Sequence, residues 1–412
     1  MKKILLYSIA LNALFISGCN KDDEPKPEPE PQGPVAVEKT DSTRLWVHYM
    51  PWFETPATSD NGGWGIHWTM ASMNPENIDG EGRREIASHF YPLIGPYASS
   101  DKDVIEYHLL LMKYSGIDGL IIDWYGSSDL WDYPLNRRNA EAVIDMLNKV
   151  GLTFAITYED YTLESLINNN IIESATDGAI ADFEYLEQHY FIKDNYISID
   201  NKPLLTVFGP RYIQNADDWT TVLYGISETP ALLSLWFESS ELGSNAAGEF
   251  SWVYENNTHV QNFYTNRASQ YDVAIGSAYP GFKDYYAQGG WGSNMPWSID
   301  YKDGQTLQET LEMARNSKIE YLQLVTWNDF GEGTMIEPTL EFQYTFLEKI
   351  QQFTGVMYTK ATLEKITDLY TLRKKYSSEK DEQLILDKAF TYFVSLQTDK
   401  AVHIIDSLNA IP

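Results

Sequence analysis

The 412-residue chain has little cysteine and little positive charge. Its one cysteine, Cys19, excludes an internal disulfide and any metal site built from several thiolates. Thirty Lys and Arg residues stand against 59 Asp and Glu, for a formal net charge of −29 at pH 7. Such a charge repels phosphate backbones, so we expect no nucleic-acid partner.

Several motifs of cofactor and metal chemistry are also missing. The sequence contains no Walker loop, no G-x-G-x-x-G motif after a strand and no H-E-x-x-H motif. The seven histidines are scattered without ligand spacing. We therefore expect neither a metal nor another cofactor.

The first apolar run, ILLYSIALNALF at residues 4–15, is short for a membrane span. It follows a basic MKK and precedes ISGC, where two small residues stand before Cys19. This order predicts a lipoprotein signal peptide at residues 1–18 and a lipidated Cys19, with an ordinary signal peptide and an incidental cysteine as the alternative. Residues 19–40 alternate proline with acid, which predicts an extended tether.

The acidic run after Cys19 resembles the surface-export signal of Bacteroidetes lipoproteins. The resemblance implies a protein anchored by lipid in the bacterial outer membrane, on the cell surface or the periplasmic face. We expect this anchor to be its sole contact with a membrane, and we expect a monomer.

From about residue 41, short apolar runs alternate with helical segments, which favours a parallel sheet. We predict a (β/α)8 TIM barrel with loop insertions at residues 41–355 and a helical extension at 356–412, with a doubly wound open sheet as the alternative. The predicted strands are residues 45–50, 119–124, 153–158, 203–208, 231–236, 250–255, 272–279 and 321–327.

Acids and aromatic residues recur where these strands end, which is the catalytic edge of such a barrel. Aromatic residues make up 14% of the chain, and their rings suit the C–H faces of sugars. After the last strand, TWNDFGEGTMIEPT carries Asp329 and Glu332 three positions apart. If that turn begins helically, both carboxyl groups face one pocket and can hydrolyse a glycosidic bond. The alternative is an acidic loop that caps a helix.

Three segments in this order resemble glycoside hydrolase family 99, the endo-α-mannosidases and endo-α-1,2-mannanases. They are GWGIHW at 63–68, HFYPLIGPYASSDKDVIEYHLLLMKYSGIDGLIIDWYG at 89–126 and WNDFGEGTMIEP at 327–338. The resemblance covers most of residues 44–350. The motif WNDFGE also resembles that of family 71, the α-1,3-glucanases.

The family 99 resemblance implies roles for three carboxylates. Glu332 matches the family's general acid/base. Asp329 matches the base that acts on the sugar's own 2-hydroxyl, which implies retention through an anhydro-sugar; the family has Glu here, and Asp withdraws the carboxylate by about 1.5 Å. In TYEDY, Glu159 matches a third family carboxylate and is predicted to position substrate, with a salt bridge at the barrel mouth as the alternative.

Other residues near the strand ends are candidates for substrate contact, although each can equally serve packing. They are Tyr49, Trp52, Trp64, His67, Trp68, Asp123, Trp124, Trp327 and Asn328. His108 and Glu337 are predicted to have structural roles.

The sequence thus predicts a retaining, endo-acting hydrolase of an α-mannan-like oligo- or polysaccharide. An α-1,3-glucanase-like or other glycan hydrolase is one alternative. A non-catalytic surface glycan-binding lipoprotein is another.

Overall fold

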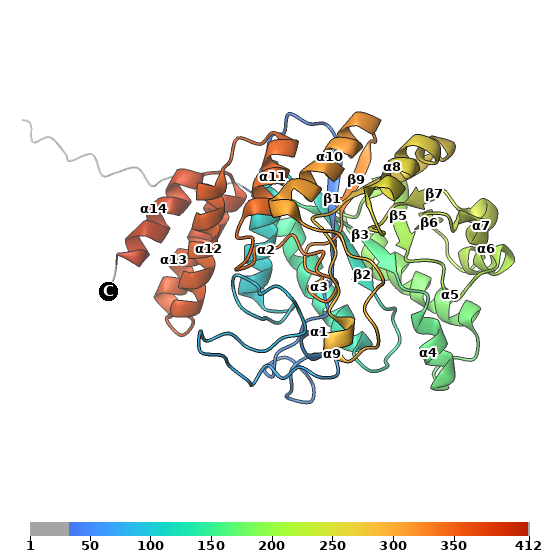
Figure 1. The fold of residues 1–412 in the computed structure, drawn as a ribbon, viewed down its shortest axis with the longest axis horizontal. Coiled ribbons are helices and arrows are strands. Elements are labelled where there is room, and N and C mark those ends of the chain that lie inside the picture. Colours follow the sequence, from blue (N-terminus) through green and yellow to red (C-terminus); the bar gives the residue numbers. More distant parts are fainter. Residues whose placement is uncertain (1–32, 411–412) are drawn as a thin grey trace, which may run out of the picture.

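The computed structural model describes residues 33–410, so the predicted signal peptide and Cys19 lie outside the described residues. Its centre is a closed barrel of eight parallel strands (Figure 1). These are β1 (Arg44–Tyr49), β2 (Gly119–Trp124), β3 (Thr153–Tyr158), β5 (Lys202–Val207), β6 (Ala231–Leu235), β7 (Gly248–Phe250), β8 (Val273–Ala278) and β9 (Tyr321–Leu324). β1 pairs with β2 and β9, and β3 pairs with β5, which closes the sheet and confirms the barrel over the open sheet.

Helices surround this barrel in the order that the sequence predicts. The principal ones are α2 (Lys102–Tyr114), α3 (Tyr133–Val150), α4 (Thr162–Asn168), α5 (Ala175–Leu186), α6 (Ala216–Tyr224), α8 (Asn257–Asn266), α10 (Gln305–Ser317) and α11 (Thr345–Thr354). The side chain of Asp101 caps α2 by accepting a hydrogen bond from the Asp103 N–H. After α2 the chain turns at Gly116, which has φ +79° and leaves no room for a Cβ beside Thr354.

The structure corrects two details of the predicted barrel. The sixth barrel strand, β7, covers residues 248–250 and not 250–255. A short strand, β4 (Ser198–Ile199), pairs antiparallel with β5 and was not predicted. β6 and β7 are joined only by the one-turn α7 (Ser239–Leu242) and a 3-10 turn at Gly243–Asn245.

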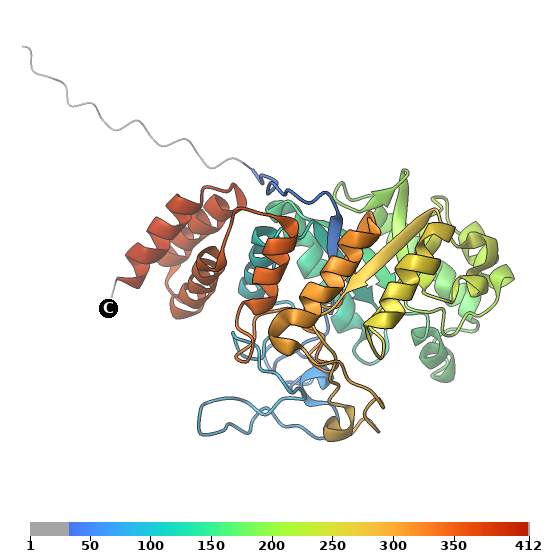
Figure 2. The same ribbon diagram turned by 45° about the horizontal axis from the view of Figure 1, so that its top comes forward.

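Two long loops wall the mouth of the barrel. The loop after β1 contains only one short helix, α1 (Ile66–Thr69), as the predicted insertion requires, and the loop after β8 contains α9 (Tyr286–Gly289). Both loops gather at one end of the molecule (Figures 1 and 2). They are joined there by a hydrogen bond of 2.8 Å from the Ala71 N–H to the Gly289 carbonyl.

The last three helices are α12 (Lys360–Lys375), α13 (Lys380–Val394) and α14 (Thr398–Asn409), which pack together beside the barrel (Figure 1). α12 lies against α2, where the guanidinium of Arg373 pairs with the carboxylate of Glu106 at 3.0 Å. Both side chains are buried. Across residues 33–410, no helix combines the length and the apolar character needed to cross a membrane.

Candidate active site

Four carboxylates gather at the ends of neighbouring strands. Asp123 lies at the end of β2, Glu159 follows β3, and Asp329 and Glu332 follow β9. The sheet order β3–β2–β1–β9 brings these ends to one sector of the barrel mouth. The charge of Asp123 raises the pKa of Glu159, and the charge of Asp329 raises the pKa of both Asp123 and Glu332, as expected of groups that lie close together.

The segment after β9 is a turn and not the start of a helix. The Asp329 carboxylate accepts a hydrogen bond of 2.8 Å from the Glu332 N–H, and the Asp329 N–H donates to the Thr326 hydroxyl. Gly333 then takes φ +69°, and a Cβ there would lie 2.6 Å from the Tyr301 hydroxyl oxygen. The Asp329 side chain therefore stabilises the turn that carries Glu332.

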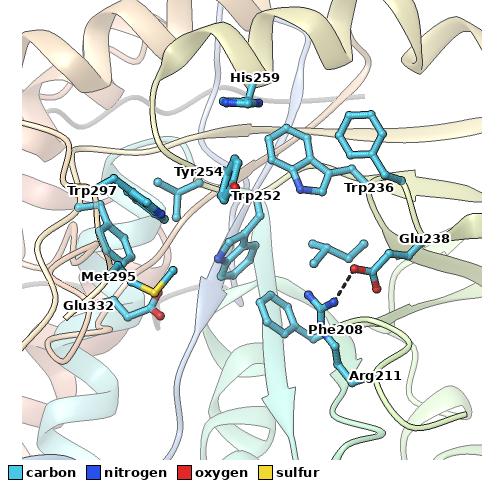
Figure 3. Close-up of a pocket in the computed structure, with 14 residues that line it drawn as sticks. Phe208, Arg211, Trp236, Glu238, Trp252, Tyr254, His259, Met295, Trp297 and Glu332 are labelled. Carbon is cyan, nitrogen blue, oxygen red and sulfur yellow. Dashed lines mark hydrogen bonds and ion pairs between the residues drawn. The ribbon is translucent and has the colours of Figure 1, made fainter. Parts of the chain in front are cut away.

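Because of this turn, the two acids line different cavities. The Asp329 cavity has a volume of about 510 Å³, and Glu159 also lines it. The Glu332 cavity has a volume of about 450 Å³ (Figure 3). Tyr286, which donates to Glu332, also lines the Asp329 cavity, so the two cavities meet at the Asp329–Glu332 turn, and a single pocket for both carboxyl groups stays a prediction.

The Glu332 carboxyl group is held by Tyr286 of α9, whose hydroxyl donates a hydrogen bond of 2.7 Å to its Oε1. Burial raises the pKa of Glu332 to about 8, and the negative charge of Asp329 adds to this rise. Glu332 is therefore protonated at neutral pH and can give a proton to a leaving oxygen.

Asp329 has the more polar surroundings. Burial raises the pKa of its carboxyl group to about 6, while backbone N–H groups of Glu332 and Gly331 and the charge of His67 oppose the rise. His67 is held by stacking on Trp52, with ring centroids 4.1 Å apart and planes 3° apart. At neutral pH Asp329 is ionised beside a protonated Glu332, which is the division that acid–base catalysis needs.

Asp123 and Glu159 form a second pair. Burial raises the pKa of both carboxyl groups, and a hydrogen bond joins them. Two carboxylates in such contact cannot both be ionised at little cost, so they share a proton. Asp123 thereby orients Glu159 toward the Asp329 cavity that it lines.

Aromatic rings form most of the Glu332 cavity (Figure 3). Phe282 and Trp297 pack at a tilt with ring centroids 4.1 Å apart, and Trp252 packs edge-on against Phe208 with centroids 4.9 Å apart. Arg211 and Glu238 form an ion pair at the opposite side from Glu332 (Figure 3). Flat apolar walls with polar groups at the ends suit the C–H faces and hydroxyl rims of sugars.

Comparison with known proteins places the chain in a family. The profile of Glycosyl hydrolase family 99 matches residues 41–371. The chain belongs to glycosyl hydrolase family 99. It is accordingly a glycoside hydrolase, and the expected membership of family 99 is confirmed.

Relatives of this family 99 chain are distant. A glycoprotein endo-alpha-1,2-mannosidase-like protein of Mus musculus is 25% identical over 327 residues, which cover 71% of this chain and 69% of the relative. A glycoprotein endo-alpha-1,2-mannosidase of Xenopus laevis is 22% identical over 72% of this chain and 70% of its own length. The structure of a family 99 endo-alpha-mannosidase from Bacteroides thetaiotaomicron is 18% identical and covers 77% of this chain and 99% of its own, with a TM-score of 0.58, and shares the fold.

Within this family 99 barrel, some predicted contact residues lie at the cavities. Trp52 and His67 line the Asp329 cavity together with Glu159. Trp64 and Trp52 line a third cavity next to it. Asp123 is nearly inaccessible and acts through Glu159.

Five other predicted contact residues are completely buried, and their positions give them a packing role instead. They are Tyr49, Trp68, Trp124, Trp327 and Asn328. For example, the Asn328 amide bonds to both backbone groups of Met50. Trp124 packs on Tyr185 and Tyr190, because successive residues of a strand point to opposite sides and Asp123 points inward.

His108 and Glu337 have the structural positions that the sequence predicts. The Glu337 carboxylate accepts a hydrogen bond of 2.7 Å from the Tyr97 hydroxyl and lies 3.2 Å from His108 Nε2. His108 also contacts the Tyr49 hydroxyl at 3.3 Å. The side chains of Tyr49, Tyr97, His108 and Glu337 are all buried, so this network fixes the end of the loop that follows β9.

Several cavity residues were not predicted from the sequence. Besides Tyr286, they include the aromatic residues Tyr125, Trp131, Tyr133, Trp252, Trp291 and Trp297. Most come from loops outside the strand ends, where an aromatic residue gives no periodic signal. In the part of the chain that the structure describes, no three His, Cys, Asp or Glu side chains are grouped so as to hold a metal ion.

Proposed function

We propose that this family 99 protein cleaves internal bonds of an α-linked, mannose-containing glycan. The observation that carries the proposal is the Asp329–Glu332 turn, which separates two cavities and carries a protonated and an ionised carboxyl group. The names of the relatives, endo-alpha-1,2-mannosidases, support mannose as the sugar.

In the first step, Glu332 gives its proton to the oxygen of the leaving sugar as the bond from that oxygen to C1 breaks. Asp329 takes the proton of the 2-hydroxyl, and that oxygen forms a bond to C1. The product is a 1,2-anhydro-sugar with no covalent bond to the protein.

This mechanism discriminates between sugars. Attack by the 2-oxygen requires it to lie on the ring face opposite the leaving group. An α-mannoside has this arrangement, whereas an α-glucoside has both oxygens on the same face. The site therefore favours α-mannosides over the α-1,3-glucans of the alternative reading.

In the second step, water opens the anhydro-sugar at C1. Glu332, now ionised, takes a proton from this water, and Asp329 returns its proton to the 2-oxygen. Two displacements at C1 restore its configuration, so we propose that the reaction retains the anomeric configuration. Glu159 positions the ring, held by its bond to Asp123.

Cavities on both sides of the turn also support endo action. A glycan that occupies both the Asp329 cavity and the Glu332 cavity has sugar units on each side of the bond that breaks. The test is digestion of a panel of α-mannans and α-1,3-glucan with sizing of the products. Oligosaccharides from α-mannan support the proposal. Release of monosaccharide alone, or cleavage of α-1,3-glucan alone, contradicts it.

We also propose that Cys19 carries the lipid anchor. The support is the order of basic, apolar and small residues before it and the proline-rich tether after it. A Cys19→Ala variant should leave the membrane fraction of expressing bacterial cells. Unchanged membrane association of that variant contradicts the anchor.

A further inference from the structure

A third cavity adjoins the Asp329 cavity and has no part in the chemistry described above. Its volume is about 760 Å³, and the loop after β1 and the helix α3 form its walls. We call it the β1–α3 cavity. Trp52 and Trp131, among others, line both it and the Asp329 cavity, so the two are contiguous.

Polar groups at the wall of the β1–α3 cavity lack partners. Asn136 is 1% exposed, yet neither its Oδ1 nor its Nδ2 has a hydrogen-bond partner among residues 33–410. Glu54 Oε2 and Trp52 Nε1 are also buried and have no hydrogen-bond partner within the described chain. Each buried polar atom left unpaired is costly, and native proteins keep few of them. A ligand that both donates and accepts hydrogen bonds would satisfy this set.

One of these groups is fixed in place. The other oxygen of Glu54, Oε1, accepts hydrogen bonds of 2.9 Å from Arg138 and 2.8 Å from Asn139. Glu54 is 2% exposed, so its free oxygen cannot turn to bulk water. A preorganised acceptor of this kind suits the hydroxyl of a ligand.

Aromatic rings complete the cavity wall. Trp64 is held from outside, because its Nε1 donates to Glu76 at 2.7 Å and Arg84 lies 5.1 Å from its ring centre. Trp131, at the junction with the Asp329 cavity, is 68% exposed and adopts φ +47°, an unfavourable conformation for a tryptophan. Exposed aromatic faces beside fixed polar groups suit the stacking of a sugar ring.

The charges at this cavity select among ligands. Glu54, Asp60 and Asp132 line it, and no Lys or Arg does so in the described chain; Arg138, outside the lining, pairs with Glu54 and Asp60, which leaves Asp132 to repel an anion. An anionic ligand would be repelled, and a purely apolar one would leave Asn136 unpaired. A neutral ligand rich in hydroxyl groups satisfies both conditions.

We propose that the β1–α3 cavity is an additional subsite, which binds a neutral sugar unit of the glycan beyond those in the Asp329 and Glu332 cavities. This inference rests on the proposed function. It makes the protein an enzyme whose efficiency rises with the length or branching of its substrate, because the additional unit contributes binding that short substrates lack.

The test compares α-manno-oligosaccharides of increasing length. Leu135→Trp fills the β1–α3 cavity with a larger side chain, and Asn136→Ala removes the unpaired amide. Leu135 and Asn136 line the β1–α3 cavity but neither the Asp329 cavity nor the Glu332 cavity. Leu384→Trp is the matched control, since Leu384 is exposed on α13. Circular dichroism and the melting temperature establish that each variant is folded.

We expect kcat/KM of the unchanged protein to rise with length. Leu135→Trp and Asn136→Ala should each lower kcat/KM about tenfold on the long substrates, which corresponds to the loss of one or two hydrogen bonds. They should leave kcat/KM on the shortest substrate unchanged. Leu384→Trp should leave kcat/KM unchanged on both long and short substrates. Equal losses at all lengths, or no loss at any length, overturn the subsite.

A binding measurement separates this inference from the proposed function. In a Glu332→Gln background, calorimetry with the longest oligosaccharide should give about tenfold weaker binding when Leu135→Trp is added. If no α-mannoside is cleaved, the proposed function fails. The same calorimetry with neutral α-glucan oligosaccharides then tests whether the β1–α3 cavity binds a sugar. Equal affinity with and without Leu135→Trp for every oligosaccharide overturns the proposed subsite.

Discussion

The hydrogen bond from Tyr286 to Glu332 allows a quantitative test of the acid–base assignment. The Tyr286 hydroxyl donates to Oε1 of Glu332 at 2.7 Å. A hydrogen bond to an ionised group is worth about 1.5–3 kcal/mol and one between neutral groups about 0.5–1.5 kcal/mol. The bond therefore favours ionised Glu332 by about 1–1.5 kcal/mol. Since one pKa unit corresponds to about 1.4 kcal/mol, Tyr286→Phe should raise the pKa of Glu332 by about one unit.

The consequence is a shift in one limb of the pH–rate profile. Activity requires ionised Asp329, so kcat/KM rises as pH passes the Asp329 pKa of about 6. It also requires protonated Glu332, so kcat/KM falls as pH passes the Glu332 pKa of about 8. Tyr286→Phe should move the alkaline limb to higher pH by about one unit and leave the acid limb in place.

The assay is kcat/KM for an α-mannoside between pH 4 and pH 10. Tyr285→Phe is the matched control, because the neighbouring hydroxyl contacts Met73 and not Glu332. A lower maximum in Tyr286→Phe is compatible with the reasoning, since Tyr286 also lines the Asp329 cavity. An alkaline limb that stays in place or moves to lower pH refutes it.

Three further predictions concern stability and positioning. Arg373→Ala leaves buried Glu106 with only Lys102, at 3.4 Å, as its cation and should lower the free energy of unfolding by about 3 kcal/mol in urea denaturation, whereas Arg373→Met with Glu106→Leu should lose much less; equal losses argue against the pair. Gly333→Ala should lose about 1–3 kcal/mol, because φ there is +69° and the added Cβ meets Tyr301; an unchanged melting temperature speaks against this. Glu159→Gln should raise KM more than it lowers kcat in steady-state kinetics, and a reversed order assigns Glu159 to the chemistry.

The barrel could be predicted from the sequence because its strands are buried apolar runs with clear helical spacing between them. The one misplaced strand has a physical reason. In FSWVYE the aromatic residues Trp252 and Tyr254 suit a strand by type, but Trp252 is buried and Tyr254 exposed, and both line the Glu332 cavity after β7 has ended. A cavity wall and a strand produce the same apolar pattern.

The proposed catalytic pair could be located in the sequence because its motif stands at a strand end. Only some of the contact residues could, because a shift of one residue turns a side chain from the barrel interior to the surrounding helices. Asp123 and Trp124 are neighbours in β2, and only Asp123 joins the cluster. Tyr286 comes from a loop, and only the folded chain brings it to Glu332.

The most direct test of the acid–base pair is proton NMR of an α-manno-oligosaccharide during digestion. The unchanged protein should first release the α-anomer at the new reducing end. Glu332→Gln and Asp329→Asn should each lower the rate by about 10²–10⁴ while the circular dichroism spectrum is unchanged. Initial release of the β-anomer, or full activity of either folded variant, would contradict the assignment.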